Sequence, residues 1–264
     1  MKVNTPTTKS VAAYIESIDI GNVDSEGGLE GTPEGQSVSD DIFSDQEQIV
    51  TVGGTLTQYS PSVDPTLRSV ISNSLLLAHL NSKKTLGLDV APTEWLTHYS
   101  EVLANIGWLP AAPVSGHQTF DGTGLEVKEN LLAIVTALLS GAVPLATSSL
   151  IIELLQGLES SGKDKPWITL FDQETQSSNT QLFQLGHAYL NESEDPEIGL
   201  VAISMDAKKS FTQLLFFKWQ AVSASLNHVS NKARCNKEEL MKHEQRLSDK
   251  LHAHTRQFII DVDI

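Results

Sequence analysis

The chain is poor in cysteine, basic residues and aromatic side chains. Of its 264 residues one is a cysteine, Cys235, so an intramolecular disulfide is excluded. The opening residues, Met1 to Thr5, lack the charged-then-apolar pattern of a secretory signal peptide. We therefore expect synthesis in a reducing cytoplasm. Export is the alternative, because some effectors leave the cell without a cleaved signal peptide.

The shortage of basic residues makes this an acidic protein. It has 18 Lys and Arg residues against 33 Asp and Glu residues, a formal net charge of −15. Nucleic acid and anionic membranes are not attracted to a net acidic surface, so neither is an expected partner. The imbalance is greatest in residues 1–65, where eleven acidic residues face two lysines, a net charge of −9.

Sequence motifs for catalysis or metal binding are also lacking. There is no Gly-x-Ser-x-Gly elbow, no His-Glu-x-x-His and no dinucleotide fingerprint. His243, His252 and His254 do not have the spacing of a tetrahedral metal site, since helical positions two apart point in different directions. We interpret these histidines as solvent-exposed on a charged helix. The sequence thus predicts no cofactor and no metal, and it favours a non-enzymatic protein.

Composition divides the chain into two parts. Residues 1–47 form an acidic, low-complexity N-terminal arm, in which Gly21–Asp45 has too few large apolar residues to offset the entropy of ordering. Residues 48–264 are apolar enough to form a single domain. The expected fold class is α+β, with a helical N-terminal half packed on an antiparallel β-meander and a C-terminal helix.

Helical spacing of apolar residues and end signals predict the helices. Asp64 before Pro65 is a helix N-terminus, and Asn236 with Glu239 has capping-box form. The predicted helices span about 65–84, 92–106, 125–140, 143–158 and 237–254.

Apolar runs and turn residues predict the strands. Gly53-Gly54 between two short alternating runs predicts a hairpin of residues 48–52 and 55–59. Further strands are expected between about 166 and 226, beginning with Pro166–Phe171, and the last residues after Phe258 alternate like a short strand. The Pro- and Gly-rich segment from Pro110 to Gly124 is expected to be a connection.

An almost uncharged stretch runs from Leu131 to Leu158, with Glu153 its only charged side chain. A membrane-spanning helix needs about 20 apolar residues, whereas Gly141 and Pro144 divide this stretch into halves of roughly 13. A thin polar stripe on each half favours two helices packed inside a globular fold. The alternative is a hairpin that is sheltered in a soluble form and released into a bilayer, as in pore-forming toxins.

The lone cysteine has a basic sequence environment. Cys235 directly precedes the predicted helix N-cap and is flanked by Arg234 and Lys237, and both the helix N-terminus and the cations favour a thiolate. This predicts a lowered pKa and a reactive or acylated cysteine, with His228 and His243 as candidate bases. The alternative is an ordinary small residue at a helix entrance.

Two functional classes follow. The first is a non-enzymatic binding or effector-type protein, toxin- or virulence-like, acting through the apolar helices at 131–158 or through partner contacts. The second is a lipid-carrying or cysteine-dependent protein, an acyl-transfer or S-acylated protein centred on Cys235. A protein partner, self-association and a lipid or membrane partner are all compatible with the sequence. Residues 232–256 hold seven basic and four acidic residues, a docking surface for the acidic arm or an acidic partner.

Overall fold

The computed structural model describes residues 8–21, 42–122, 129, 132–138, 149–157, 165–175, 181–206 and 222–262. Its strands are β1 (Gln48–Val52), β2 (Thr55–Tyr59), β3 (Leu109–Pro110), β4 (Val114–Gly122), β5 (Gln181–Leu190), β6 (Pro196–Asp206), β7 (Val222–Arg234) and β8 (Ile259–Asp261). Its helices are α1 (Thr8–Ser17), α3 (Pro65–Leu86), α4 (Pro92–Asn105), α6 (Ser149–Gly157), α7 (Pro166–Thr175), α9 (Lys237–Met241) and α10 (Glu244–Phe258), and residues 132–138 are also helical.

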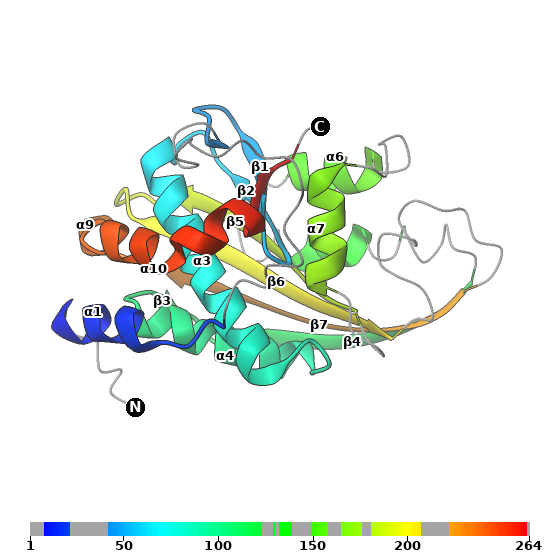
Figure 1. The fold of residues 1–264 in the computed structure, drawn as a ribbon. Coiled ribbons are helices and arrows are strands. Elements are labelled where there is room, and N and C mark those ends of the chain that lie inside the picture. Colours follow the sequence, from blue (N-terminus) through cyan, green and yellow to red (C-terminus); the bar gives the residue numbers. More distant parts are fainter. Residues whose placement is uncertain are drawn as a thin grey trace.

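The described strands form one mixed sheet of eight strands, drawn in Figure 1. Their order is β3-β7-β6-β5-β2-β1-β8, and β4 also pairs with β7. Strands β5, β6 and β7 make the antiparallel meander that the sequence predicts, and the α+β class is confirmed. Strands β2 and β5 run parallel, so the sheet as a whole is mixed.

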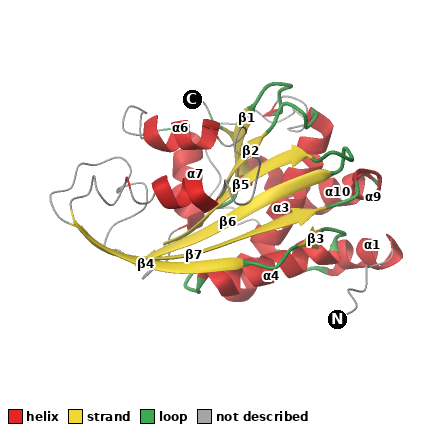
Figure 2. Cartoon of the chain, turned by 180° about the vertical axis from the view of Figure 1, so that it is seen from behind, coloured by secondary structure: helices red, strands yellow, loops and turns green. Residues whose placement is uncertain are grey.

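Helices cover both faces of this sheet (Figure 2). Side chains of successive strand residues point to opposite faces. In β6, Leu200 and Ala202 therefore pack with α1, α3, α4 and α10, whereas Val201 and Ile203 pack with 132–138, α6 and α7. A sheet buried on both faces explains why β5 and β6 are nearly continuous apolar runs in the sequence.

The two helix N-caps and the hairpin turn predicted from the sequence are confirmed. Asp64 accepts a hydrogen bond from the Leu67 amide at 2.9 Å and so caps α3. Asn236 accepts one from the Glu239 amide at 3.0 Å and caps α9. The hairpin has the predicted strands and turns at Gly53-Gly54.

Three expectations are corrected. Residues 166–171 are not a strand but the start of α7, because Trp167, Ile168 and Phe171 recur at helical spacing and are all buried. Much of the expected connection 110–124 is strand β4, whose backbone pairs with β7 although few of its residues are apolar. The predicted helix 237–254 is divided at residues 242–243, where a turn redirects the chain so that α10 runs along α3. Residues 207–221, part of another expected strand, lie outside the described residues.

Helix α1 lies within the predicted acidic arm, most of which (residues 22–41) lies outside the described residues. Val11 and Ile15 of α1 are buried in the core. Glu16 lies 3.9 Å from Arg246 of α10, and α1 packs beside α10. Apolar burial accounts for most of this attachment, because an exposed ion pair at that distance contributes little.

A fully buried arginine ties the open end of the hairpin to α3. The Arg68 guanidinium donates to the carbonyls of Gln46, Ser60 and Val63 at 2.7, 3.1 and 2.7 Å, and it lies 5.7 Å from the centre of the Tyr59 ring. Burial lowers the pKa of Arg68. These bonds fix the open end of the hairpin, where β1 begins and β2 ends, on the first turn of α3.

We predict that Arg68→Met lowers the free energy of unfolding by about 2–4 kcal/mol, because the carbonyls of Gln46, Ser60 and Val63 lose the hydrogen bonds that the buried guanidinium donates. Arg234→Met is the control: Arg234 is exposed at the end of β7, and its removal is expected to change stability by less than about 0.5 kcal/mol. Urea denaturation measures both. Equal stabilities for the two variants would contradict the role given to Arg68.

Candidate functional site

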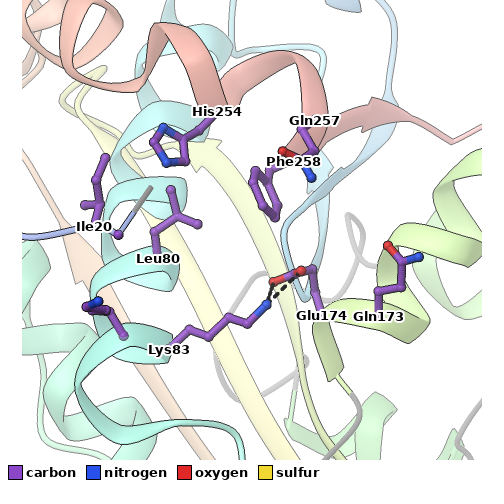
Figure 3. A pocket seen from close by; sticks show the side chains of 10 residues that line it. Ile20, Leu80, Lys83, Gln173, Glu174, His254, Gln257 and Phe258 are labelled. Atoms are coloured by element: carbon purple, nitrogen blue, oxygen red, sulfur yellow. Dashed lines mark hydrogen bonds and ion pairs between the residues drawn. The ribbon is translucent and has the colours of Figure 1, made fainter. Parts of the chain in front are cut away.

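The C-terminal turns of three helices converge on a cavity of about 680 Å³ (Figure 3). Helices α3 and α10 belong to one helical layer and α7 to the other. The cavity is lined by Ile20, Gly21, Leu80, Lys83, Lys84, Gln173, Glu174, His254, Gln257 and Phe258. Its size lies within the range of small-molecule sites, roughly 300–1,000 Å³.

One wall of the cavity is a buried ion pair. Glu174 is 5% exposed, and its two carboxylate oxygens accept hydrogen bonds from the Lys83 ammonium at 2.9 and 2.8 Å. His79 Nε2 lies 2.9 Å from Oε2 of the same carboxylate. Lys83 is 38% exposed and reaches Glu174 from the cavity side, as Figure 3 shows. This cluster joins α7 to α3, and with them the two helical layers.

The Glu174 carboxyl is ionised in this setting. Burial alone raises its pKa, but the hydrogen bond and charge of His79, together with Lys83, outweigh burial and hold the pKa below its ordinary value. A buried carboxylate stabilised in this way depends on both partners, because removing one leaves a charge with too few hydrogen bonds.

The hairpin turn packs directly on His79. A Cβ at Gly53 would lie 2.5 Å from the imidazole, and one at Gly54 would lie 2.8 Å from the Glu174 carbonyl oxygen. Gly53 has φ +55, a conformation that glycine adopts without strain. Trp95 lies against His79 edge-on, with ring centres 5.6 Å apart. Thus α3 holds the hairpin at both ends, by Arg68 and by His79, whose separation of about 16 Å along the helix matches a five-residue strand.

The opposite wall of the cavity carries a histidine. His254 is 7% exposed and stacks on Phe258 with ring centres 6.2 Å apart. Burial lowers its pKa, and a hydrogen bond with the Gly21 backbone opposes this decrease in part. His243 is also buried, so of the three histidines predicted to be exposed only His252 is. The face of α10 that bears His243 and His254 is covered by the fold.

Cys235 is buried, and its thiol pKa is shifted in the direction opposite to that predicted from the sequence. It is 2% exposed, and its sulfur donates to the Gly107 carbonyl oxygen at 3.3 Å. Burial, followed by the charges of Asp195 and Glu239, raises the thiol pKa to about 12, the opposite of the predicted decrease. The cations expected to lower this pKa are outweighed by desolvation and by acidic residues distant in the sequence. Cys235 lines neither of the two described cavities.

The four residues proposed to support Cys235 are dispersed. Arg234 is exposed at the end of β7, and Lys237 pairs with Asp64 at 3.3 Å. His228 packs over Gly116 of β4, and His243 begins α10. The hydrogen-bond acceptors described for the sulfur are carbonyl oxygens and not a histidine. The described structure therefore gives the thiol no catalytic partner.

The apolar stretch 131–158 is described at 132–138 and 149–157, where it is helical. Val135, Ile151 and Leu155 are fully buried against the sheet, as expected for packed helices. No described helix is long and apolar enough to cross a membrane.

Within the described residues no group of three or more His, Cys, Asp or Glu side chains is placed to hold a metal ion.

No protein-family model matches the chain, and no curated protein matches it in sequence. Solved structures that resemble its fold in part include a delta-endotoxin, at 12% identity and a TM-score of 0.41 over 78% of this chain and 91% of the other. The activated Cyt2Ba monomer from Bacillus thuringiensis subsp. israelensis gives 13% identity and a TM-score of 0.41 over 69% and 96%. The Evf virulence factor gives 12% and 0.35 over 83% and 88%.

The cavity cluster was not found by sequence reasoning. Glu174 lies 95 residues from His79 in the sequence, so no local motif joins them. One signal was present: His79 and Lys83 are four residues apart and therefore share a helix face. The segment that supplies the acid was assigned to a strand region, which concealed its partner.

We predict that Gly53→Ala lowers the free energy of unfolding by about 1–3 kcal/mol more than Gly87→Ala, since only the first meets a locked side chain. Both glycines have positive φ, and a Cβ at Gly87 would have no neighbour within 4 Å. Gly87→Ala thus controls for backbone strain. Thermal and urea denaturation measure the difference, and equal losses would contradict close packing of the turn on His79.

We predict that Glu174→Gln lowers stability at pH 7 by about 1–3 kcal/mol, through loss of charge-assisted hydrogen bonds. The folded-state pKa of Glu174 is depressed, so its contribution is present above the unfolded pKa of about 4.3 and is lost as pH falls through the folded value. The stability gap between wild type and variant should therefore narrow below about pH 4. A gap that widens on acidification would show the opposite sign for the shift.

Proposed function

We propose that the protein is a non-enzymatic, toxin-like effector that acts on lipid membranes by releasing one helical layer from its sheet. This layer, here called the α6–α7 layer, consists of residues 132–138, Ser149–Gly157 and Pro166–Thr175. The supporting observation is that its inner surface is apolar, whereas a strong polar tie to the rest of the protein is concentrated at Glu174.

The composition of the layer favours an apolar environment. Residues 132–138 and α6 contain one charged side chain, Glu153, which is exposed. Val135, Ile151 and Leu155 contact the sheet together with Trp167 and Phe171 of α7. Another polar attachment is the Ile151 amide, which donates to Gln58 Oε1 at 3.0 Å. Residues 132–138 and α6 therefore lose little when their surroundings change from a protein core to lipid, whereas α7 also carries Asp172 and Glu174.

Release into water would be unfavourable. Exposing apolar surface costs about 25 cal/mol per Å², both for the layer and for the sheet face that it leaves. A bilayer interface removes part of this cost, because short helices with an apolar face insert among the acyl chains parallel to the membrane plane. The proposal therefore places the layer on the membrane interface and not across the bilayer.

The net charge of −15 determines which lipid headgroups the protein can approach. Anionic lipid would repel the protein, and a zwitterionic surface would not. Phosphatidylcholine vesicles are therefore the appropriate target for a direct test.

We predict that Lys83→Met increases leakage of dye from phosphatidylcholine vesicles. Losing the Lys83–Glu174 pair should weaken the attachment of α7 to α3 by about 1–2 kcal/mol, allowing for the partial exposure of Lys83. The fraction of molecules with the α6–α7 layer released should then rise about 5–30-fold. Lys232→Met, which removes the same charge from an exposed position on β7, should leak like wild type.

General instability is controlled by Arg68→Met, which weakens the attachment of the hairpin and leaves Glu174 paired. If leakage rises with Lys83→Met but not with Arg68→Met of equal or lower stability, release of the α6–α7 layer is the cause. Absence of leakage for wild type and for every variant would overturn the proposed function.

A further inference from the structure

A buried histidine lies on the sheet face that the α6–α7 layer covers. His187 is in β5, where side chains of successive residues point to opposite faces of the sheet. Phe183, Leu185 and Tyr189 of the same strand belong to the core beneath this layer, so His187 shares their face. His187 is 1% exposed. Its imidazole is therefore shielded from water while the layer is in place.

The imidazole of His187 is not hydrogen-bonded. Neither Nδ1 nor Nε2 has a partner among the described residues, and the ring lies edge-on to Tyr189 with ring centres 5.8 Å apart. Its pairing partner in β6 is Gly199, which offers no side-chain acceptor. A protonated imidazole has two N–H donors, and burying its charge without acceptors is far more costly than burying the neutral ring. The described surroundings of His187 therefore suit only the neutral form.

The first turn of α6 opposes a positive charge at this place. The amide of Ile151, the third residue of α6, donates to Gln58 Oε1 at 3.0 Å, and Gln58 of β2 is the pairing partner of His187 in β5. Neighbouring strands lie about 4.8 Å apart, so the N-terminus of α6 lies over the residue next to the histidine. A helix N-terminus carries roughly half a positive charge. A proton on His187 would therefore repel the end of α6 that contacts the sheet.

No charged side chain around the ring compensates for such a proton. None of those on the surrounding elements makes a described hydrogen bond or ion pair with His187. Glu197 accepts a hydrogen bond from the Tyr189 hydroxyl at 2.6 Å, and burial together with Glu197 raises the pKa of Tyr189, which stays neutral. Glu174 is bonded to His79 and Lys83. The charged residues on the elements around the ring are Glu47, Glu129, Glu153, Lys165, Asp172, Glu174 and Glu197, of which the first three are exposed.

Burial lowers the pKa of His187 from its ordinary value of 6.5 to about 4. Once the layer has left the sheet, water reaches the ring and the ordinary value applies. The released form therefore binds the proton more tightly. Attachment of the layer is strongest above about pH 6.5 and weakens as the pH falls towards about 4. Glu174 stays ionised over this range, because its own pKa is held below the ordinary value.

We propose that His187 is an acid-sensitive trigger: protonation of its imidazole beneath the α6–α7 layer drives the layer off the sheet. This inference rests on the proposed function and adds the condition, mild acid, under which the layer is released. At neutral pH the bonds of Glu174 hold the layer in place. In acid the charge on His187 opposes them.

Native-state hydrogen exchange of the α6 amides at pH 7 and pH 5 tests the trigger without membranes, after correction for the intrinsic effect of pH on exchange. The two pKa values of His187 predict that the released fraction rises about 20-fold between these conditions. His187→Leu removes the titrating group and should abolish the rise. His243→Leu removes another buried histidine, at the start of α10, and should preserve it.

Three results would overturn the trigger. They are an unchanged released fraction in the wild type, a rise of the same size in α3, and a rise of the wild-type size in His187→Leu. Titration of the His187 ring by nuclear magnetic resonance needs no variant. A midpoint of about 4 is expected in the folded protein, and a midpoint near the ordinary value of 6.5 would also overturn the trigger.

Leakage from phosphatidylcholine vesicles separates the trigger from the membrane function. Acid-dependent exchange of α6 without leakage by any variant at either pH would support the trigger and overturn the membrane function. Leakage by Lys83→Met without acid-dependent exchange of α6 in the wild type would support the membrane function and overturn the trigger.

Discussion

The carboxylate of Glu174 is the constraint on which the arrangement of the fold depends. It is buried at the end of α7, and the Lys83 ammonium and the His79 imidazole reach it from α3. Because a buried charge is tolerated only with its partners, this contact fixes α7 relative to α3. The same imidazole supports the Gly53-Gly54 turn, so helical layers on opposite faces of the sheet and the hairpin meet at one point. The cavity lies beside this point because three helix ends converge there.

This arrangement gives the two helical layers unequal attachments. Helices α3, α4 and α10 share a large core with α1 and hold the hairpin by Arg68 as well as by His79. The α6–α7 layer has its own smaller core on the other face, and Glu174 joins it to α3. Elements with fewer cooperative ties are those that open locally at lower free energy. The proposed detachment of the α6–α7 layer and the position of the cavity therefore both depend on this one contact.

Local signals in the sequence were sufficient for much of the fold, and long-range packing accounts for the rest. The cap at Asp64, the cap at Asn236 and the hairpin turn depend on neighbouring residues, and all were predicted. Helix α7 was misassigned because a short apolar run after a proline fits a strand or a helix equally well. The Cys235 pKa was predicted with the wrong sign because Asp195, distant in sequence, and burial determine it. The Glu174 cluster joins residues 95 positions apart, a pairing that one sequence does not reveal.

The central claim is that the α6–α7 layer opens as a unit about the Glu174 tie. Residue-resolved native-state hydrogen exchange tests it most directly. The account predicts that the amides of α6 and α7 exchange through a common opening, at a free energy clearly below that of α3, β5 and β6. Exchange of α6 and α7 only through global unfolding, at the same free energy as α3, would contradict the account.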